Sequence, residues 1–417
     1  MTNWRIKLSL FLNYFVFAML LNSVGTVILQ VQNSYGVSKV DASILEAFKD
    51  LSIAIVSFLV ASFLSNFGYK RSMLVALGAV TLACLVMPSL PFFAMNKILF
   101  AIVGASFALI KVSVYSTIGL VTPNQKEHAS LMNFIESFFM VGILVSYFAF
   151  AFFIDESNPQ STNWLKVYYF LSAISAVAFV LLWGAPLDES AAQTTTNKDF
   201  IKSFKEMFDL MLVPLVLLFV CSAFIYVLVE QGIMSWMPTF NQEVLRLPTT
   251  LSIQMASILA ASTALGRFVA GIVMRRFHWF NIIATCLILA ALLVIVVIPM
   301  AQGAQDKIYT GWSDAPLAAF AFPLIGFLLA PIYPAINSLI LSNLPKEKHA
   351  TMAGLSVVFS ALGGTLGSII TGHVFERFGG VNAFYCSLFP LSLLLVILYL
   401  FNRLVTKQLQ QQDIYAK

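Results

Sequence analysis

The chain of 417 residues is 59% hydrophobic and only 10% charged, and its formal net charge is +5. Because soluble domains carry about 25% charged residues, this composition excludes a water-soluble globular enzyme. The basic excess does not indicate a nucleic-acid-binding surface, since most of the Lys and Arg residues lie in short loops between apolar stretches. Lys70-Arg71 and Arg275-Arg276 are two such loops.

Apolar stretches of spanning length recur along the whole chain. A helix needs about 20 mainly apolar residues to cross a bilayer. Twelve stretches meet this requirement: 8–29, 43–65, 72–94, 97–121, 130–153, 164–186, 210–239, 250–274, 280–300, 316–341, 350–374 and 383–402. An even number of spans places both termini on one side, and the basic loops mark that side as cytoplasmic. We therefore predict an all-α integral membrane protein with twelve transmembrane helices.

The chain also divides into two related halves. A polar stretch at 188–206 separates six spans from six, and two short sequences occur once in each half. The sequence at 126–131 is similar to that at 347–352, and the sequence at 42–45 is repeated at 256–259. Internal repeats are typical of transporters. We predict two pseudo-symmetric six-helix bundles at 1–186 and 207–403, a cytoplasmic linker at 187–206 and a cytoplasmic tail at 404–417.

Two features of the spans predict local geometry. Gly363, Gly364 and Gly367 lie within an apolar span, where small residues permit close helix contact, so a phosphate-binding loop is not the favoured interpretation. Pro331 and Pro334 are expected to bend the tenth span. No nucleotide-binding or metal-binding pattern is present, so we expect no cofactor.

The second span contains three charged residues, Glu46, Lys49 and Asp50. Lys49 is expected to pair with Glu46, three residues earlier on the same helix, which leaves Asp50 for Lys111 or for water. Glu46 lies near the outer boundary of the span and is expected to reach the membrane surface by snorkelling. This cluster has a structural interpretation and a functional one, and the structural interpretation is favoured.

The organisation of the chain resembles that of the major facilitator superfamily along essentially its whole length. Tyr226, followed by Glu230-Gln231-Gly232-Ile233-x-x-Trp236-x-Pro238-x-Phe240, is similar to the fucose:proton symporter family, including its TsgA-type branch. The resemblance implies a secondary transporter of the bacterial inner membrane in which two bundles expose a midplane site alternately. The acidic positions of the family's sugar symporters fall on Gly25 and Lys111, so its proton relay does not carry over. The loop at Gly68 likewise lacks the Asp of the superfamily motif.

The resemblance further implies that the first, fourth, seventh and tenth spans line the substrate cavity, and these spans carry polar residues on common helical faces. The predicted substrate-binding residues are Asn22, Lys111, Tyr115, Tyr226, Glu230, Trp236, Tyr333 and Asn337. The alternative is that these side chains form hydrogen bonds between helices and only hold the bundle together.

The intramembrane charges suggest proton coupling. Asp50, Glu136 and Glu230 outnumber Lys49 and Lys111 by one, and desolvation can turn an excess carboxylate into a proton carrier. The proton-coupling candidates are thus Glu230 first, then Glu136 and Asp50.

The predicted function is secondary active transport of a small polar solute: a sugar, a sugar acid or a small carboxylate. The expected partners are this solute, a coupling ion that we expect to be H⁺, and membrane lipid, with no nucleic acid, and the protein is expected to be a monomer. The alternatives are export of drugs, siderophores or amphipathic metabolites and, more remotely, a membrane receptor without transport.

Overall fold

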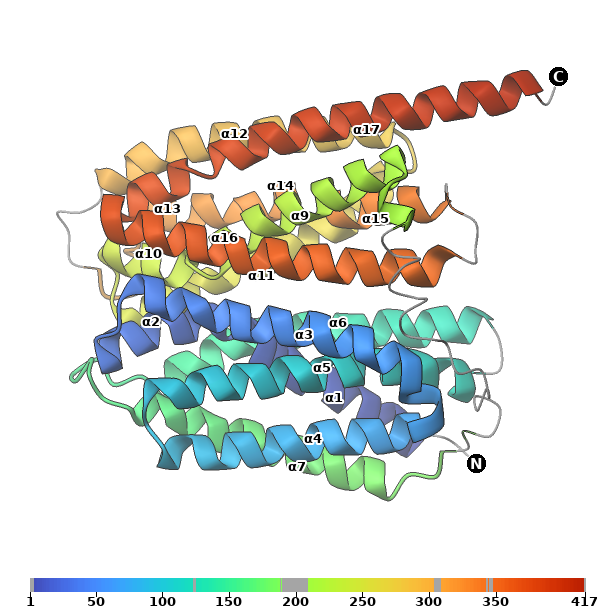
Figure 1. Ribbon diagram of the computed structural model, residues 1–417. Coiled ribbons are helices and arrows are strands. Elements are labelled where there is room, and N and C mark those ends of the chain that lie inside the picture. The colour runs from blue at the N-terminus through green and yellow to red at the C-terminus, as the bar shows by residue number, and fades with distance from the viewer. Residues whose placement is uncertain are drawn as a thin grey trace. The chain divides into compact units, whose positions relative to one another are not determined.

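The computed structural model describes residues 4–122, 125–187, 189, 209–303, 309–342, 344 and 348–415. Within these ranges the regular structure is entirely α-helix and short 3-10 turns (Figure 1). The predicted linker at 187–206 lies almost entirely outside the described residues, so its boundaries stay a prediction.

The helices follow the predicted spans. The first half contains α1 (Trp4–Asn22), α2 (Val24–Tyr35), α3 (Lys39–Phe67), α4 (Tyr69–Val86), α5 (Phe93–Val121), α6 (Gln125–Phe152) and α7 (Val167–Trp183). The second contains α9 (Pro214–Met234), α10 (Met237–Glu243), α11 (Thr249–Val273), α12 (Trp279–Gln302), α13 (Leu317–Ala321), α14 (Ile325–Leu329), α15 (Ile332–Ser342), α16 (His349–Tyr385) and α17 (Leu388–Tyr415).

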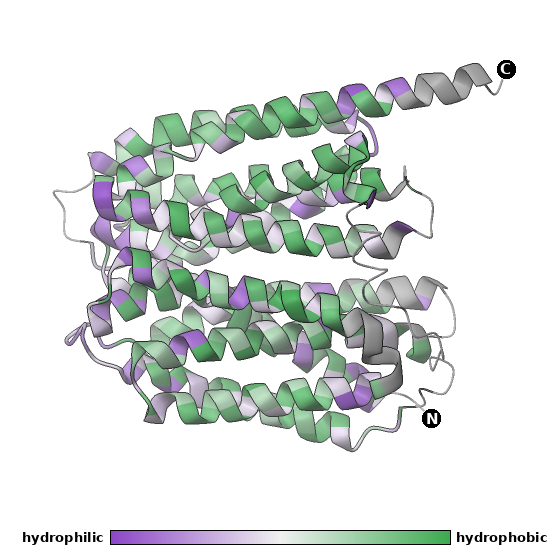
Figure 2. Ribbon diagram, in the orientation of Figure 1, coloured by the Kyte–Doolittle hydropathy of each residue, from purple (hydrophilic) through white to green (hydrophobic). Residues whose placement is uncertain are grey.

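Hydrophobic residues occupy most of each helix, and hydrophilic residues gather mainly towards the helix ends (Figure 2). Among the described residues, 11 helical segments are long and apolar enough to cross a membrane. The remaining predicted span corresponds to α3, which is also long but carries Glu46, Lys49 and Asp50. The prediction of an all-α, multi-pass membrane fold is therefore confirmed.

The chain forms two compact units, one of Met1–Asp199 with Pro248–Ser257 and the other of Phe200–Leu247 with Ile258–Lys417. Corresponding helices have corresponding neighbours in each unit. In the first unit α1 packs against α6 and α7, and α4 packs against α5 and α7. In the second, α9 packs against α16 and α17, and α12 packs against α14 and α17. This pairing of helices is expected of two bundles that share one helix arrangement.

Glycines bring the backbones of these paired helices together. A Cβ atom on Gly142 of α6 would lie 2.7 Å from the carbonyl oxygen of Phe15 in α1. At the equivalent place in the second unit, a Cβ atom on Gly363 of α16 would collide with the carbonyl oxygen of Phe224 in α9. Gly367, one turn further on, lies equally close to the carbonyl oxygen of Leu228. The prediction that this glycine run serves helix packing is confirmed.

Several spans are broken where the backbone departs from one continuous helix. The first span divides at Ser23, between α1 and α2. The tenth span divides near Pro331, because α14 ends at Leu329 and α15 begins at Ile332. Proline cannot donate a backbone hydrogen bond, so the span is interrupted at the place where a bend is predicted.

Two helix ends in the first unit brace each other. The Glu189 carboxylate accepts hydrogen bonds from the backbone N–H groups of Tyr69 (3.1 Å) and Lys70 (2.6 Å) at the start of α4. Lys70 Nζ in turn donates to the carbonyl oxygens of Trp183 (3.0 Å) and Ala185 (2.6 Å) at the end of α7. An anion at a helix N-terminus and a cation at a C-terminus both match the helix dipole. Glu189 thus supplies a carboxylate to the loop that lacks the family's Asp.

Replacement of Gly363 by Ala is expected to destabilise the second unit by about 1–3 kcal/mol, because α16 and α9 must move apart to admit the new methyl group. The measurement is the thermal unfolding midpoint of the purified full-length protein. Gly271→Ala is the matched control: Gly271 is also helical, but a Cβ atom there has no neighbour within 4 Å. Equal midpoints for the two variants would contradict the assigned packing role.

Candidate functional site

A lysine and a tyrosine–glutamate pair form the polar cluster of the first unit. Lys111 on α5 is exposed, and its Nζ lies 6.0 Å from the ring centroid of Phe107. Among the described residues, no ion pair to Lys111 is present. One turn later on α5, the Tyr115 hydroxyl donates to Glu136 Oε1 of α6 at 2.6 Å. The predicted residues Lys111 and Tyr115 therefore lie on one face of α5, and Glu136 of α6 is bound to Tyr115.

Aromatic rings from α1 border this cluster. The ring of Tyr14 lies 6.1 Å from that of Tyr115 and 6.4 Å from that of Phe107. The Tyr14 side chain is 2% exposed, so it packs within the first unit and lines the cluster with its ring.

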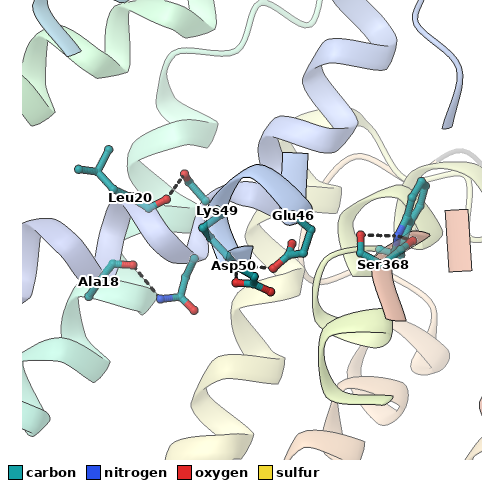
Figure 3. Close-up of polar contacts among 9 residues, drawn as sticks. Ala18, Leu20, Glu46, Lys49, Asp50 and Ser368 are labelled. Atoms are coloured by element: carbon teal, nitrogen blue, oxygen red, sulfur yellow. Dashed lines mark hydrogen bonds and ion pairs between the residues drawn. The ribbon is translucent and has the colours of Figure 1, made fainter. Parts of the chain in front are cut away.

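The charged residues of α3 form ion pairs with one another, and not with Lys111, in a buried triad (Figure 3). Lys49 Nζ forms ion pairs with Glu46, as predicted, and with Asp50 Oδ1 at 3.4 Å. The side chains of Glu46, Lys49 and Asp50 are 0%, 5% and 10% exposed. The expectation that Asp50 would be left for Lys111 or water is therefore wrong. The expectation that Glu46 snorkels is also wrong, because its carboxylate is fully buried beside Lys49.

The polar cluster of the second unit is centred on α9 and α15. The Tyr226 hydroxyl donates to Glu230 Oε1 at 2.6 Å, one turn along α9. The rings of Tyr226 and Tyr333 stack with centroids 5.7 Å apart. These three predicted residues form one connected cluster, in which a half-buried carboxylate is again held by a tyrosine hydroxyl.

Two serines of α16 complete this cluster and were not predicted. The Tyr333 hydroxyl lies within hydrogen-bonding distance of Ser356 Oγ (2.8 Å) and Ser360 Oγ (3.0 Å). Ser356 also donates to the side-chain oxygen of Asn337 at 3.3 Å. The signal that sequence reasoning passed over is the spacing of four between the serines, which places both on one face of α16.

The two other predicted binding residues, Asn22 and Trp236, lie in different surroundings. The amide nitrogen of Asn22 donates to the Ala18 carbonyl oxygen at 2.9 Å, and the side chain is partly exposed. Trp236 is 0% exposed, and its indole N–H donates to the Ser368 carbonyl oxygen at 3.0 Å. Asn22 is thus within reach of a ligand, whereas the polar atom of Trp236 is already used within the second unit.

Each cluster contains groups that can bind a polar molecule or exchange a proton. Both units have a carboxylate and tyrosine hydroxyls; the first adds the ammonium group of Lys111 and the second the amide of Asn337. Within the described part of the chain, no group of three or more His, Cys, Asp or Glu side chains is placed to hold a metal ion.

The comparisons with known proteins agree with the fold of the chain. The sequence profile described as Major Facilitator Superfamily matches residues 10–368. No curated protein sequence gives a significant match.

Three solved structures are similar to this chain. The nucleoside transporter NupG has 12% sequence identity and a TM-score of 0.72, and the match covers 96% of this chain and 98% of that one. The xylose transporter XylE from E. coli, in its inward open conformation, has 13% identity and a TM-score of 0.73, with 96% of each chain covered. FucP, in its outward conformation, has 15% identity and a TM-score of 0.61, with 97% and 99% covered. At these identities the structures show a shared fold.

Replacement of Lys49 by Met is expected to lower the free energy of unfolding by about 3–5 kcal/mol, because two buried carboxylates lose their common cation. Asp50→Asn is expected to cost much less, since the Glu46–Lys49 pair remains. Both values come from thermal or denaturant unfolding of the full-length protein. A Lys49→Met variant as stable as Asp50→Asn would contradict the structural role of the triad.

Proposed function

The chain belongs to the Major Facilitator Superfamily, and we propose that it moves a small polar solute across the membrane by proton-coupled alternating access. The family and the membrane-spanning helices make it a multi-pass membrane transporter and not an enzyme. We place it in the bacterial inner membrane as a monomer with both termini in the cytoplasm, in keeping with its basic loops.

The Tyr226–Glu230 pair is the observation that carries this proposal. Glu230 lies in the membrane-spanning helix α9, is half-buried, and accepts a hydrogen bond from a neutral hydroxyl. A carboxylate in such a setting can bind and release a proton as water reaches it, and that is what coupling to a proton gradient requires. The Tyr115–Glu136 pair repeats this chemistry in the first unit.

Asp50 is a third candidate with a different mode of action. The triad of Glu46, Lys49 and Asp50 holds two acids and one base, so a single proton would make it neutral. Because all three side chains are buried, a proton reaches them only when α3 moves or water enters. We therefore place Glu230 and Glu136 ahead of Asp50 as proton carriers.

The residues proposed to bind the substrate lie in two polar clusters, one in each unit. Asn22, Lys111 and Tyr115 are at least partly exposed in the first unit, as are Glu230, Tyr333 and Asn337 in the second. Tyr226 is buried but orients Glu230 and stacks on Tyr333. Hydroxyl and amide groups of this kind suit a hydroxylated solute.

Export of an amphipathic molecule is the second candidate function, and one feature favours it. An apolar cavity of about 520 Å³ lies between α9, α16 and α17, lined by residues such as Phe224, Leu228 and Phe359. Neither Tyr226 nor Glu230 lines this cavity. A hydrophobic compound that binds there would not compete with a polar solute, so competition assays separate the two functions.

Replacement of Glu230 by Gln is expected to abolish pH-gradient-driven uptake into proteoliposomes, because the amide cannot bind and release the coupled proton. Downhill counterflow of the same solute is expected to remain, since Gln keeps an acceptor for the Tyr226 hydroxyl. Glu243→Gln, at an exposed carboxylate that ends α10, is the control and is expected to leave uptake intact.

The same assay ranks the other carboxylates through Glu136→Gln and Asp50→Asn. Gradient-driven uptake that persists in the Glu230→Gln variant would remove Glu230 from the mechanism. Uptake that persists in all three variants would show that transport does not depend on these acids.

A further inference from the structure

We infer that Lys111 binds an acidic group of the substrate, and that the transported solute is a small hydroxylated carboxylate. This inference rests on the proposed function and names its substrate class. It is carried by the contrast between Lys111 and the other charged residues of the membrane-spanning helices in the first unit.

The position of Lys111 is the first part of the argument. Lys111 lies in the interior of the 29-residue helix α5, far from either end. A cation at such a depth is unfavourable unless it meets an anion or faces a water-filled cavity. Lys111 is exposed, so packed protein does not surround its side chain.

The acids around Lys111 are already engaged. Glu136 accepts a hydrogen bond from Tyr115 and forms no ion pair with Lys111. Asp50 and Glu46 on α3 share Lys49. Within the described part of the chain, Lys111 is therefore a cation without an internal anion, and an anionic ligand would supply the missing charge.

The neighbouring side chains indicate what else the ligand carries. Phe107 places an aromatic ring beside the ammonium group at 6.0 Å, and Tyr115 lies one turn along the same helix. The ring of Tyr14 lies 6.1 Å from that of Tyr115 and 6.4 Å from that of Phe107. Aromatic faces and hydroxyl groups recognise the carbon skeleton and hydroxyls of a sugar-like molecule.

The number of charges favours a carboxylate over a phosphate. Phosphate is recognised by several charge-assisted donors, most often from arginine, whereas this cluster offers one lysine. In the second unit, the Tyr333 hydroxyl is neutral and lies within hydrogen-bonding distance of Ser356 and Ser360. One ammonium group matches one carboxylate.

The test uses matched pairs of solutes that differ by one carboxylate: D-glucose with D-glucuronate, D-galactose with D-galacturonate, and glycerol with glycerate. Binding to the purified full-length protein is measured by the ligand-induced shift of the unfolding midpoint, and transport by proteoliposome counterflow. At least one carboxylate is expected to bind more tightly than its neutral partner. Lys111→Gln is expected to weaken that binding by about tenfold or more, as for loss of a charge-assisted hydrogen bond, and Lys111→Arg to restore part of it.

Lys97→Gln is the matched control. Lys97 lies near the start of the same helix, and its Nζ is 4.5 Å from the ring centroid of Phe93. It therefore shares the helix and the aromatic contact of Lys111 but not its depth, and its replacement is expected to leave binding unchanged. Because the unfolding midpoint of each variant without solute is measured as well, loss of fold is seen directly.

Three results would overturn the inference: no carboxylate-dependent shift across the panel, tighter binding of a neutral partner, or unchanged carboxylate binding by Lys111→Gln. If the protein carries a neutral solute with proton coupling, the proposed function holds and this inference fails. Carboxylate binding that depends on Lys111, with no proton-dependent flux in any variant, would support this inference and contradict proton coupling.

Discussion

The cost of placing a charge in an apolar medium governs the arrangement of polar residues in this protein. Each ionisable side chain within a membrane-spanning helix needs an opposite charge, a hydrogen-bond donor or access to water. Lys49 forms ion pairs with two carboxylates, and Glu136 and Glu230 each accept a hydrogen bond from a tyrosine hydroxyl. Among the described residues, Lys111 has neither kind of partner, and its side chain is exposed. These three solutions differ in how easily they can be changed. The buried triad is closed, the tyrosine-bound acids can exchange a proton, and the exposed lysine can accept a partner from outside.

The polar groups are held in register by backbone contact between helices. Gly142 lets α6 approach α1, and Gly363 lets α16 approach α9. These contacts bring Glu136 beside Tyr115, and Ser356 beside Asn337, because α6 and α16 carry the partners of the residues on α5 and α15. A larger residue at either glycine would therefore alter the helix packing and displace the hydrogen bonds together. The helix packing and the geometry of the polar groups therefore constrain each other, since close backbone contact stabilises helix association in lipid.

Local sequence rules predicted the spans, the packing role of Gly363, the Lys49–Glu46 pair and an irregularity at Pro331, where the tenth span is interrupted. Each of these depends on residues within about one helical turn or one span. The predictions that failed depend on how a side chain is covered by other helices. Glu46 is buried although its position in the span suggested a place near the membrane surface. Glu189 reaches the start of α4 from a distant part of the chain, and no periodicity in the sequence carries that information. The substrate-binding residues and proton carriers stay predictions.

The polar clusters of the two units differ in charge although their helices have similar neighbours. The cluster on α5 carries the charged Lys111, while the cluster on α15 carries Tyr333 within a network of neutral hydroxyls. A solute with one carboxylate would pair with the ammonium group of Lys111, whereas a neutral solute would gain nothing from an unpaired ammonium group. Since that group is costly to keep within the membrane, its presence is best explained by a ligand that offsets its charge.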